Sequence, residues 1–320
     1  MSENVKPMTK KVLVIGEALI DVVHGINGEI KNIPGGSQAN TAVALARLGT
    51  KTYMRARTSS DPFGTEIRNY LTNQNVILDY SLVVDSPSSV IGAFIQKDGS
   101  AKYEANLKGA ADYGWTFEEL NQVIDPDIQI VQLGSLTSYV EPGATNVEKW
   151  FAQLRQSNKH LLTFDPNIRH PLDGQNEEDV RNRAKKLASL SHVLKASDED
   201  LNWIFSSNNP KDSATKIIES GAFLVVVTLG KKGAFAVTKK LDFVEVSAKE
   251  VAVMDSIGAG DTFAAALITQ LLEKTWINES ALEKLSSADL TEILNNCSMA
   301  ASITCSRQGA NPPHRHEVTW

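Results

Sequence analysis

Short apolar runs alternate with longer stretches of mixed polarity through the second half of the chain. From about residue 127, four such runs follow one another, at residues 128–133, 161–164, 193–194 and 224–227. Uninterrupted apolar runs are typical of strands that are buried on both faces of a parallel sheet. The stretches between them, such as residues 146–155, have helical spacing. The alternation predicts an α/β fold with a doubly wound, mostly parallel sheet flanked by helices.

The first half opens in the same way and then changes character. Residues 12–15 form another continuous apolar run, which predicts a buried strand. Two later stretches alternate around the turn sequences Asn27-Gly28 and Asp98-Gly99, which are typical of hairpins. We expect the segments at about 17–33 and 88–113 to form a small sheet. Because we find no linker or internal repeat, we expect it to be inserted in a single domain of residues 1–320.

The most informative stretch is residues 255–263, Asp-Ser-Ile-Gly-Ala-Gly-Asp-Thr-Phe, which leads into an apolar helical run. Gly258 and Gly260 let the backbone approach a ligand closely, and the first amides of the helix lack intrahelical partners. A phosphate bound by Gly258, Ala259 and Gly260 would be stabilised there. Asp261 would then lie where it can take a proton from an attacking hydroxyl. The alternative is that Asp261 is an ordinary helix N-cap.

A second glycine-rich helix start occurs much earlier. Residues 34–40, Pro-Gly-Gly-Ser-Gln-Ala-Asn, lead into a short helical pattern that begins at Thr41 and ends before Gly49. Ligands of doubly wound sheets bind beyond the carboxyl ends of the strands. Several polar or small residues follow the predicted strands, namely Gly134, Ser135, Asp165, Ser197 and Gly230. The two glycine-rich helix starts together predict a site for two ligands.

These motifs together resemble the PfkB, or ribokinase-like, carbohydrate kinases. Residues 35–40 are similar to the first signature of the family and residues 255–263 to the second. Matches between and before them extend the resemblance over nearly the whole chain: residues 16–21, 165–167 and 226–233. The resemblance implies a ribokinase-like fold whose small sheet is a lid over the sugar. It also implies an enzyme that transfers the γ-phosphate of ATP to a sugar hydroxyl.

The resemblance also implies roles for single residues. Asp261 would be the general base, and the amides of residues 258–260 would form the anion hole. Sugar hydroxyls would be bound by Asp21, Gly35, Gly36 and Asn40, and the nucleotide by Ser197, Thr228, Gly230, Gly258 and Gly260. Other interpretations remain open: Asp21 could end a strand, Asn40 could cap the helix from Thr41, and Thr228 and Gly230 could form a plain turn.

The resemblance also implies that metal ions are bound. The family uses Mg²⁺ with ATP, and Asp200 would act on it through a bound water. Many members have Asn at position 197 and Glu at position 200, so Ser197 and Asp200 are departures. The acidic run 198–200 is also typical of an exposed helix start. Some relatives imply a K⁺ ion near Asp255. The loop at Asp61 and Gly64 departs from the family pattern as well.

Within the family, the chain looks most like the fructokinases. Arg169, in the segment 165–169, could meet a substrate carboxylate or phosphate, so 2-keto-3-deoxygluconate kinase is the main alternative. A structural ion pair is the other interpretation of Arg169. Ribokinase and nucleoside kinase are further alternatives. A hypothesis of a different class is a non-catalytic sugar-binding regulator that kept the fold.

Composition narrows the partners. The chain has 320 residues, of which 42% are hydrophobic, and a net charge of −6, which argues against nucleic acid as a partner. No apolar run is long enough to cross a membrane, and residues 1–10 are polar, so we expect a cytoplasmic protein. Homodimerisation through the lid stays open.

Other patterns predict no additional chemistry. Cys297 and Cys305 lie eight positions apart in a helical pattern, about 12 Å along the axis, which is too far for a disulfide. His314 and His316 lack further metal ligands, so we expect a role in a solvated or packed tail. Residues 16–21 lack the second and third glycines of a dinucleotide-binding fingerprint. We find no P-loop sequence either.

Overall fold

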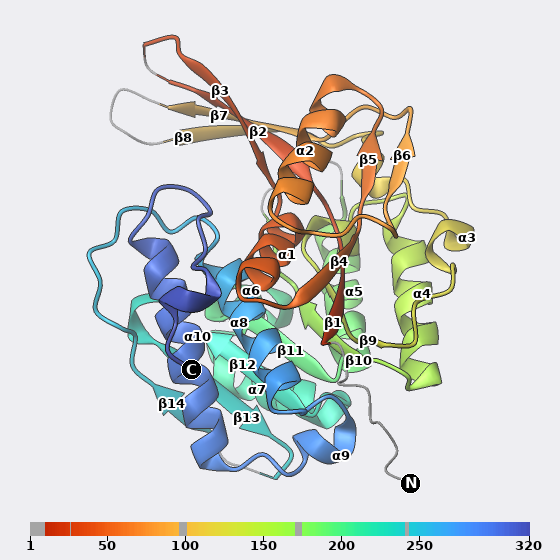
Figure 1. Ribbon diagram of the computed structural model, residues 1–320. Helices are drawn as coiled ribbons and strands as arrows, with labels where there is room; N and C mark the ends of the chain where they lie inside the picture. The colour runs from red at the N-terminus through yellow and green to blue at the C-terminus, as the bar shows by residue number, and fades with distance from the viewer. Residues whose placement is uncertain (1–9, 26, 96–100, 170–174, 241–242) are drawn as a thin grey trace, which may run out of the picture.

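The computed structural model describes residues 10–25, 27–95, 101–169, 175–240 and 243–320. Its larger sheet has eight strands (Figure 1), whose spatial order is β14 (Val244–Val246), β13 (Ala234–Thr238), β12 (Leu224–Thr228), β11 (Val193–Ser197), β10 (Leu161–Asp165), β9 (Ile128–Gly134), β1 (Lys11–Ile15) and β4 (Lys51–Arg55). Neighbouring strands are parallel from β4 to β12, whereas β13 and β14 run antiparallel. The predicted doubly wound, mostly parallel sheet is confirmed.

Helices cover both faces of this sheet. Side chains of α1 (Ser37–Arg47), α8 (Ala259–Glu273) and α10 (Ser287–Cys305) form a core with Val12 and Val14 of β1. The opposite face packs Leu13 and Ile15 against α4 (Ala144–Ser157), α5 (Glu177–Leu190) and α7 (Pro210–Ser220). The remaining α-helices of the described residues are α2 (Pro62–Asn73), α3 (Phe117–Leu120), α6 (Asp198–Phe205) and α9 (Glu279–Leu282). Successive residues of β1 therefore enter two cores, which explains its uninterrupted apolar sequence.

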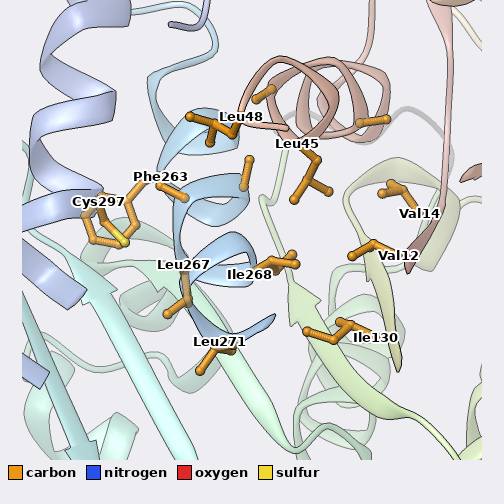
Figure 2. Close-up of a cluster of buried hydrophobic side chains, with 14 of the residues drawn as sticks. Val12, Val14, Leu45, Leu48, Ile130, Phe263, Leu267, Ile268, Leu271 and Cys297 are labelled. Atoms are coloured by element: carbon orange, nitrogen blue, oxygen red, sulfur yellow. The ribbon is translucent and has the colours of Figure 1, made fainter. Parts of the chain in front are cut away.

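Helix α8 is the central element of the first core. Its residues are buried from position 261 to position 272, and α1 and α10 pack against it. Figure 2 shows Ile268 on the side of α8 that faces Val12 and Ile130 of the sheet, and Phe263 beside Cys297. Truncating a buried Leu to Ala in such a core costs about 2–5 kcal/mol. Burial on all sides fixes the position of the helix and therefore of its first turn.

The smaller sheet has the order β3 (Ile30–Gly35), β2 (Leu19–His24), β7 (Val90–Ile95) and β8 (Ala101–Asn106). Strands β2 and β7 are parallel, and the two outer pairs are antiparallel hairpins. The second sheet was predicted, but β3 extends to Gly35, beyond the expected boundary at residue 33. The Asp98-Gly99 turn lies outside the described residues. A parallel pair of short strands, β5 (Arg57–Ser59) and β6 (Leu82–Val84), was not predicted.

Both glycine-rich helices start earlier than the sequence pattern indicates. Gly36, with φ 102°, precedes α1, so Asn40 lies inside the first turn and does not cap the helix. Gly258, with φ 76°, precedes α8, so Asp261 lies inside the first turn too. The interpretation of Asp261 and Asn40 as ordinary N-caps is therefore wrong. Only glycine adopts these conformations readily, which explains the starting points.

Two smaller expectations concern cysteine and membranes. Cys297 and Cys305 are both free, as their spacing on one helix predicted. Within the described ranges, none of the helices combines the length and the apolar character needed to span a bilayer.

Candidate active site

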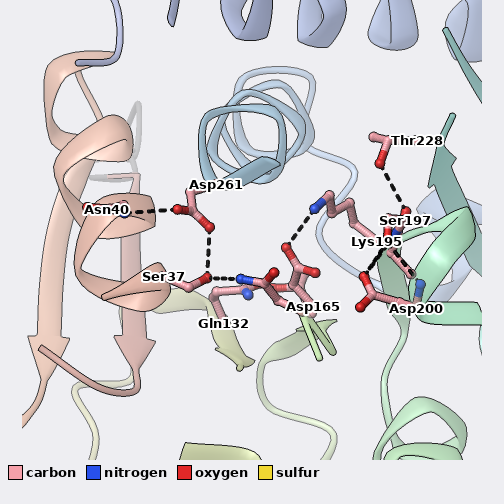
Figure 3. A network of polar contacts seen from close by, with 12 residues as sticks. Ser37, Asn40, Gln132, Asp165, Lys195, Ser197, Asp200, Thr228 and Asp261 are labelled. Atoms are coloured by element: carbon pink, nitrogen blue, oxygen red, sulfur yellow. Dashed lines mark hydrogen bonds and ion pairs between the residues drawn. The ribbon is translucent and has the colours of Figure 1, made fainter. Parts of the chain in front are cut away.

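Four strands of the large sheet end at one edge with a polar or small residue. These are Gly134 of β9, Asp165 of β10, Ser197 of β11 and Thr228 of β12. Figure 3 shows the side chains of Asp165, Ser197 and Thr228 beside the start of α8, where Asp261 lies. The edge predicted to bind ligands therefore faces the first turns of both glycine-rich helices.

Asp261 is held by two side chains of α1. Ser37 Oγ donates to Asp261 Oδ1 at 2.7 Å, and Asn40 Nδ2 donates to Oδ2 at 3.0 Å (Figure 3). The aspartate is 5% exposed. Each donor contacts a different carboxylate oxygen, so the two hydrogen bonds together fix the orientation of the side chain. The geometry suits a group that accepts a proton.

Ser37 is itself fixed from the opposite side. Asn167 Nδ2 donates to Ser37 Oγ at 2.6 Å, and Gln38 Nε2 lies 3.4 Å from the same atom. Gln132 of β9 donates to Gln38. Sequence reasoning quoted the motifs that contain Ser37 and Asn167 but assigned neither residue a role. Adjacent polar residues in a motif were the available signal, and only the fold shows that Asn167 reaches Ser37 and that Ser37 reaches Asp261.

The turn before α8 is tightly packed against the C-terminal segment. A Cβ atom on Gly258 would lie 2.7 Å from Ala310 Cβ, which is closer than any normal contact. The amide of Ala259 already donates to Ser256 O at 3.3 Å. Beside Gly260, a Cβ atom would lie 3.3 Å from Lys195 Nζ. Glycine at position 258 is therefore required by the surroundings and by its positive φ, whereas a Cβ atom at position 260 would only require the end of the Lys195 side chain to shift slightly.

Asp21 lies in the interior of β2, between Ile33 of β3 and Ile91 of β7, so it does not end a strand. A Cβ atom on Gly35 would lie 2.7 Å from Asp21 Oδ2. Gly36 closely approaches the segment between β1 and β2, since its Cβ would lie 2.9 Å from Glu17 O. Burial raises the pKa of the Asp21 carboxyl to about 6. The four residues predicted to contact the sugar therefore lie in β2, at the end of β3 and at the start of α1.

Glu17 is a buried carboxyl next to these residues that the sequence did not single out. It is 1% exposed and accepts from Ser37 N at 3.2 Å and from the Thr137 amide and hydroxyl. Burial raises its pKa to about 7, although these donors oppose the shift. The side chain ties the segment between β1 and β2 to the first residue of α1.

A buried ion pair closes the other side of the site. Lys195 Nζ donates to Asp165 Oδ2 at 2.8 Å. Burial raises the pKa of Asp165 to about 6, against the attraction of Lys195. Burial alone would lower the pKa of Lys195, but Asp165 outweighs it, and the pKa stays above its ordinary value. Asp165 Oδ1 is buried and has no hydrogen-bond partner among the described residues. The sequence analysis gave this pair no role.

Ser197 and Asp200 form the capping box of α6. Ser197 Oγ accepts from Asp200 N at 3.0 Å, while Asp200 Oδ2 accepts from Ser197 N at 3.1 Å. Asp200 Oδ1 accepts from Ile168 N at 2.8 Å. At 7% exposed, Asp200 is not part of a solvated helix start. Its carboxylate fixes the loop after β10, and its metal role stays a prediction.

The other predicted residues surround this centre. Asp255 accepts from Ile257 N and Gly309 N, which ties the turn to the C-terminal segment. Thr228 Oγ1 lies 3.4 Å from Ala196 O, and Gly230 has φ 54°. Arg169 is exposed, and its guanidinium has no ion pair within the described ranges. No cluster of three His, Cys, Asp or Glu side chains able to hold a metal occurs in the described part of the chain.

Comparison with known proteins gives a consistent result. The family model for pfkB family carbohydrate kinase matches residues 9–317. Fructokinase-2 of Solanum lycopersicum is 30% identical over 94% of this chain and 92% of its own length. The fructokinase of Rhizobium leguminosarum bv. trifolii is 33% identical over 81% and 79%. A sugar kinase from Pyrococcus horikoshii, solved in complex with ATP, covers 96% of both chains at 25% identity with a TM-score of 0.79. A fructokinase from Xylella fastidiosa with bound ATP has a TM-score of 0.83 over 94% of both chains at 24% identity.

Proposed function

Since the chain belongs to the pfkB family of carbohydrate kinases, enzymes that transfer a phosphoryl group to an alcohol, we propose that it transfers the γ-phosphate of ATP to fructose. One observation carries the mechanism: Asp261 lies in the first turn of a buried helix, and Ser37 and Asn40 each donate to one of its oxygens. Fructokinases among the similar proteins support the choice of sugar, and relatives solved with ATP support the choice of donor.

In the proposed reaction, Asp261 accepts the proton of the sugar hydroxyl while the hydroxyl oxygen forms a bond to the γ-phosphorus. The bond from that phosphorus to the bridging oxygen breaks, and ADP leaves with the electron pair. The amides of Gly258, Ala259 and Gly260 stabilise the charge on the transferring oxygens. Because the alcohol loses its proton late in a loose transition state, the ionised form of Asp261 is sufficient.

The sugar and the nucleotide occupy opposite sides of this turn. We propose that Asp21, Gly35, Gly36 and Asn40 bind sugar hydroxyls below the lid. Asp21 supplies acceptors, and Asn40 supplies a donor and an acceptor. The nucleotide is bound by Ser197, Thr228, Gly230 and the glycine turn. Closure of the lid would exclude water, which otherwise competes with the sugar for the phosphoryl group.

The residues at this edge suit a magnesium ion that accompanies ATP. Mg²⁺ prefers oxygen ligands, keeps several waters and needs few protein groups. Asp165 Oδ1 is a buried carboxylate oxygen without a described partner, which fits such an ion. We propose that Asp165, and Asp200 through water, would hold it. When bound, the ion would neutralise charge on the phosphates. A K⁺ ion near Asp255 and a homodimer through the lid remain predictions, as does the single domain of residues 1–320.

A second substrate is favoured by Arg169. Its side chain is exposed and free of ion pairs with described residues, so it is available to a substrate carboxylate. 2-Keto-3-deoxygluconate would satisfy it, whereas fructose has no carboxylate. Arg169→Ala should therefore lower kcat/KM for the keto acid about 10- to 100-fold if that is the substrate, and change kcat/KM for fructose little.

ATP-dependent ADP release in the presence of magnesium tests the proposal, with D-fructose, 2-keto-3-deoxygluconate, ribose and adenosine compared as acceptors. Asp261→Asn should lower kcat about 10²- to 10⁴-fold. Glu199→Gln, an exposed acidic residue of α6, is the matched control. Preference for another acceptor would change the substrate and keep the reaction. Sugar binding without turnover in the wild type would favour a non-catalytic regulator.

A further inference from the structure

Lys195 lies close to the first turn of α8. It belongs to β11, whose end faces the start of that helix, and it is 6% exposed. Its ammonium group would be 3.3 Å from a Cβ atom on Gly260. Figure 3 shows the side chain extending from the strand past Asp165 toward this helix. A flexible cation is thus enclosed beside the turn that we propose as the anion hole.

The placement is electrostatically unusual. The start of a helix carries partial positive charge, which disfavours a cation and favours an anion. Removing an ammonium group from water costs several kcal/mol unless it is paired. Asp165 supplies one partner, and the charges of Asp200 and Asp261 also favour the charged lysine. Asp261 and Lys195 thus lie at the start of α8, with Asp165 paired to the lysine and Asp200 of α6 near enough to act on it by charge; such a cluster is typical of a functional site.

The ion pair leaves part of its bonding capacity unused. Asp165 uses Oδ2 for Lys195, while its buried Oδ1 has no described partner. An ammonium group has three N–H donors, and Lys195 uses one on Asp165. Buried donors and acceptors without partners cost free energy. A ligand that offers acceptors to the Lys195 ammonium group and a cation to Asp165 Oδ1 would recover it. A magnesium-bound polyphosphate has both.

We propose that Lys195 is a catalytic residue whose ammonium group contacts the phosphoryl group in transit between nucleotide and sugar. The inference rests on the proposed function and adds a contact to it. In the step described above, Lys195 neither gives nor takes a proton. It supplies a positive charge to the equatorial oxygens of the transferring group, from the side opposite the α1 residues that hold Asp261. A lysine on the phosphates is a recurring part of phosphoryl-transfer sites, and here no P-loop supplies one.

The competing explanation is structural. Lys195 could serve only to neutralise Asp165, in which case its replacement would leave a buried uncompensated carboxylate and lower stability and activity together. The two explanations differ when Asp165 is neutral. We therefore choose Lys195→Met in two backgrounds, wild type and Asp165→Asn. Lys240→Met, an exposed lysine paired with Glu283, is the matched control.

If Lys195 contacts the phosphoryl group, Lys195→Met should lower kcat about 10²- to 10³-fold in both backgrounds, with thermal stability recovered in the double variant. If kcat of Asp165→Asn/Lys195→Met equals that of Asp165→Asn alone, Lys195 acts only through Asp165 and the proposal is overturned. The comparison is made within the Asp165→Asn background, so any separate role of Asp165 cancels.

A binding measurement separates this proposal from the proposed function. The probe is ADP with magnesium and aluminium fluoride, which mimics the transferring phosphoryl group, compared with ADP and magnesium alone. Aluminium fluoride should lower the Kd for ADP in the wild type and in Lys240→Met. In Lys195→Met the factor by which it lowers the Kd should be at least tenfold smaller. Equal tightening in all three would refute the contact. Absence of turnover on every sugar, with fluoride-dependent binding that needs Lys195, would refute the kinase function alone.

Discussion

Ser37 Oγ donates a hydrogen bond of 2.7 Å to Asp261 Oδ1, although the two residues are 224 positions apart in the sequence. The first helix of the chain and a helix near its end thus meet at one carboxylate. Ser37 also accepts from Asn167, so three segments converge there. Ser37 therefore orients Asp261, the proposed base, although Ser37 itself does not exchange a proton with the substrate in our mechanism.

Ser37→Ala should therefore impair the reaction without impairing nucleotide binding. Loss of one hydrogen bond to a charged group corresponds to about 1.5–3 kcal/mol, or roughly 10- to 100-fold in kcat. KM for ATP should change little. Ser189→Ala is the control, because among the described residues that hydroxyl bonds to the carbonyl of Lys186 on its own helix. Steady-state kinetics with both substrates varied would decide, and an unchanged kcat would contradict the role.

Gly258→Ala should damage both stability and turnover. A left-handed conformation costs a non-glycine residue about 1–2 kcal/mol, and the contact with Ala310 adds about 1–3 kcal/mol of overpacking. Gly109→Ala is a matched control, since Gly109 has φ +72° and nothing within 4 Å of an added Cβ atom. Gly109→Ala should lose only the free energy that corresponds to the left-handed conformation, and its kcat should be unchanged. Urea unfolding measures the difference, and equal losses would mean that the C-terminal segment moves aside.

Sugar affinity should depend on pH through Asp21. The folded enzyme holds the pKa of this carboxyl at about 6 because it is buried. Above that pH the ionised group accepts sugar hydroxyls, and below it the KM for sugar should rise by about tenfold per pH unit. In Asp21→Asn the KM should be raised at all pH values and show no such limb. A rise of the sugar KM at low pH that persists in Asp21→Asn would point to Asp165, whose pKa is also about 6.

Glu17 should make the free energy of unfolding fall as pH rises. Burial raises its pKa from 4.5 to about 7, so the folded state holds this proton more tightly than the unfolded state between those values. The folded state therefore loses about 3 kcal/mol relative to the unfolded state as pH rises through this window. Glu17→Gln should remove that part of the slope between pH 4 and pH 8. Denaturation curves at both pH values test it, and identical slopes in the two proteins would be inconsistent with a raised pKa.

Much of the fold could be predicted because buried parallel strands have a distinctive sequence. Residues 224–227 have no polar interruption, and β12 spans them. The starts of α1 and α8 were misplaced because they depend on positive φ angles at Gly36 and Gly258, and such angles leave no periodic signal. The pair β5 and β6 was missed because strands of three residues are too short to show alternation.

The residues of the candidate site also divide into those that the sequence indicates and those that only the fold brings together. The glycine turn before a helical run was sufficient to single out Asp261, whereas Asn40 was singled out by the resemblance of residues 35–40 to a family signature. The positions of Ser37, Asn167 and Lys195 depend on which way a side chain points and on which strands are neighbours. Lys195 and Asp165 come together because β11 and β10 are adjacent in the sheet. Such proximity between distant segments is a property of the fold.

The close approach of Ala310 to Gly258 also has a consequence for synthesis of the protein. Every residue that we assign to the reaction precedes position 262, whereas the segment that packs against the glycine turn and binds Asp255 comes later, at Gly309 and Ala310. On the ribosome, the nascent chain therefore carries its base and its phosphate-binding amides before the segment that supports them has emerged. In our proposal, the phosphate-binding turn therefore gains its packing partner only after residues 309 and 310 have been synthesised, when the earlier strands and helices have already had the opportunity to fold.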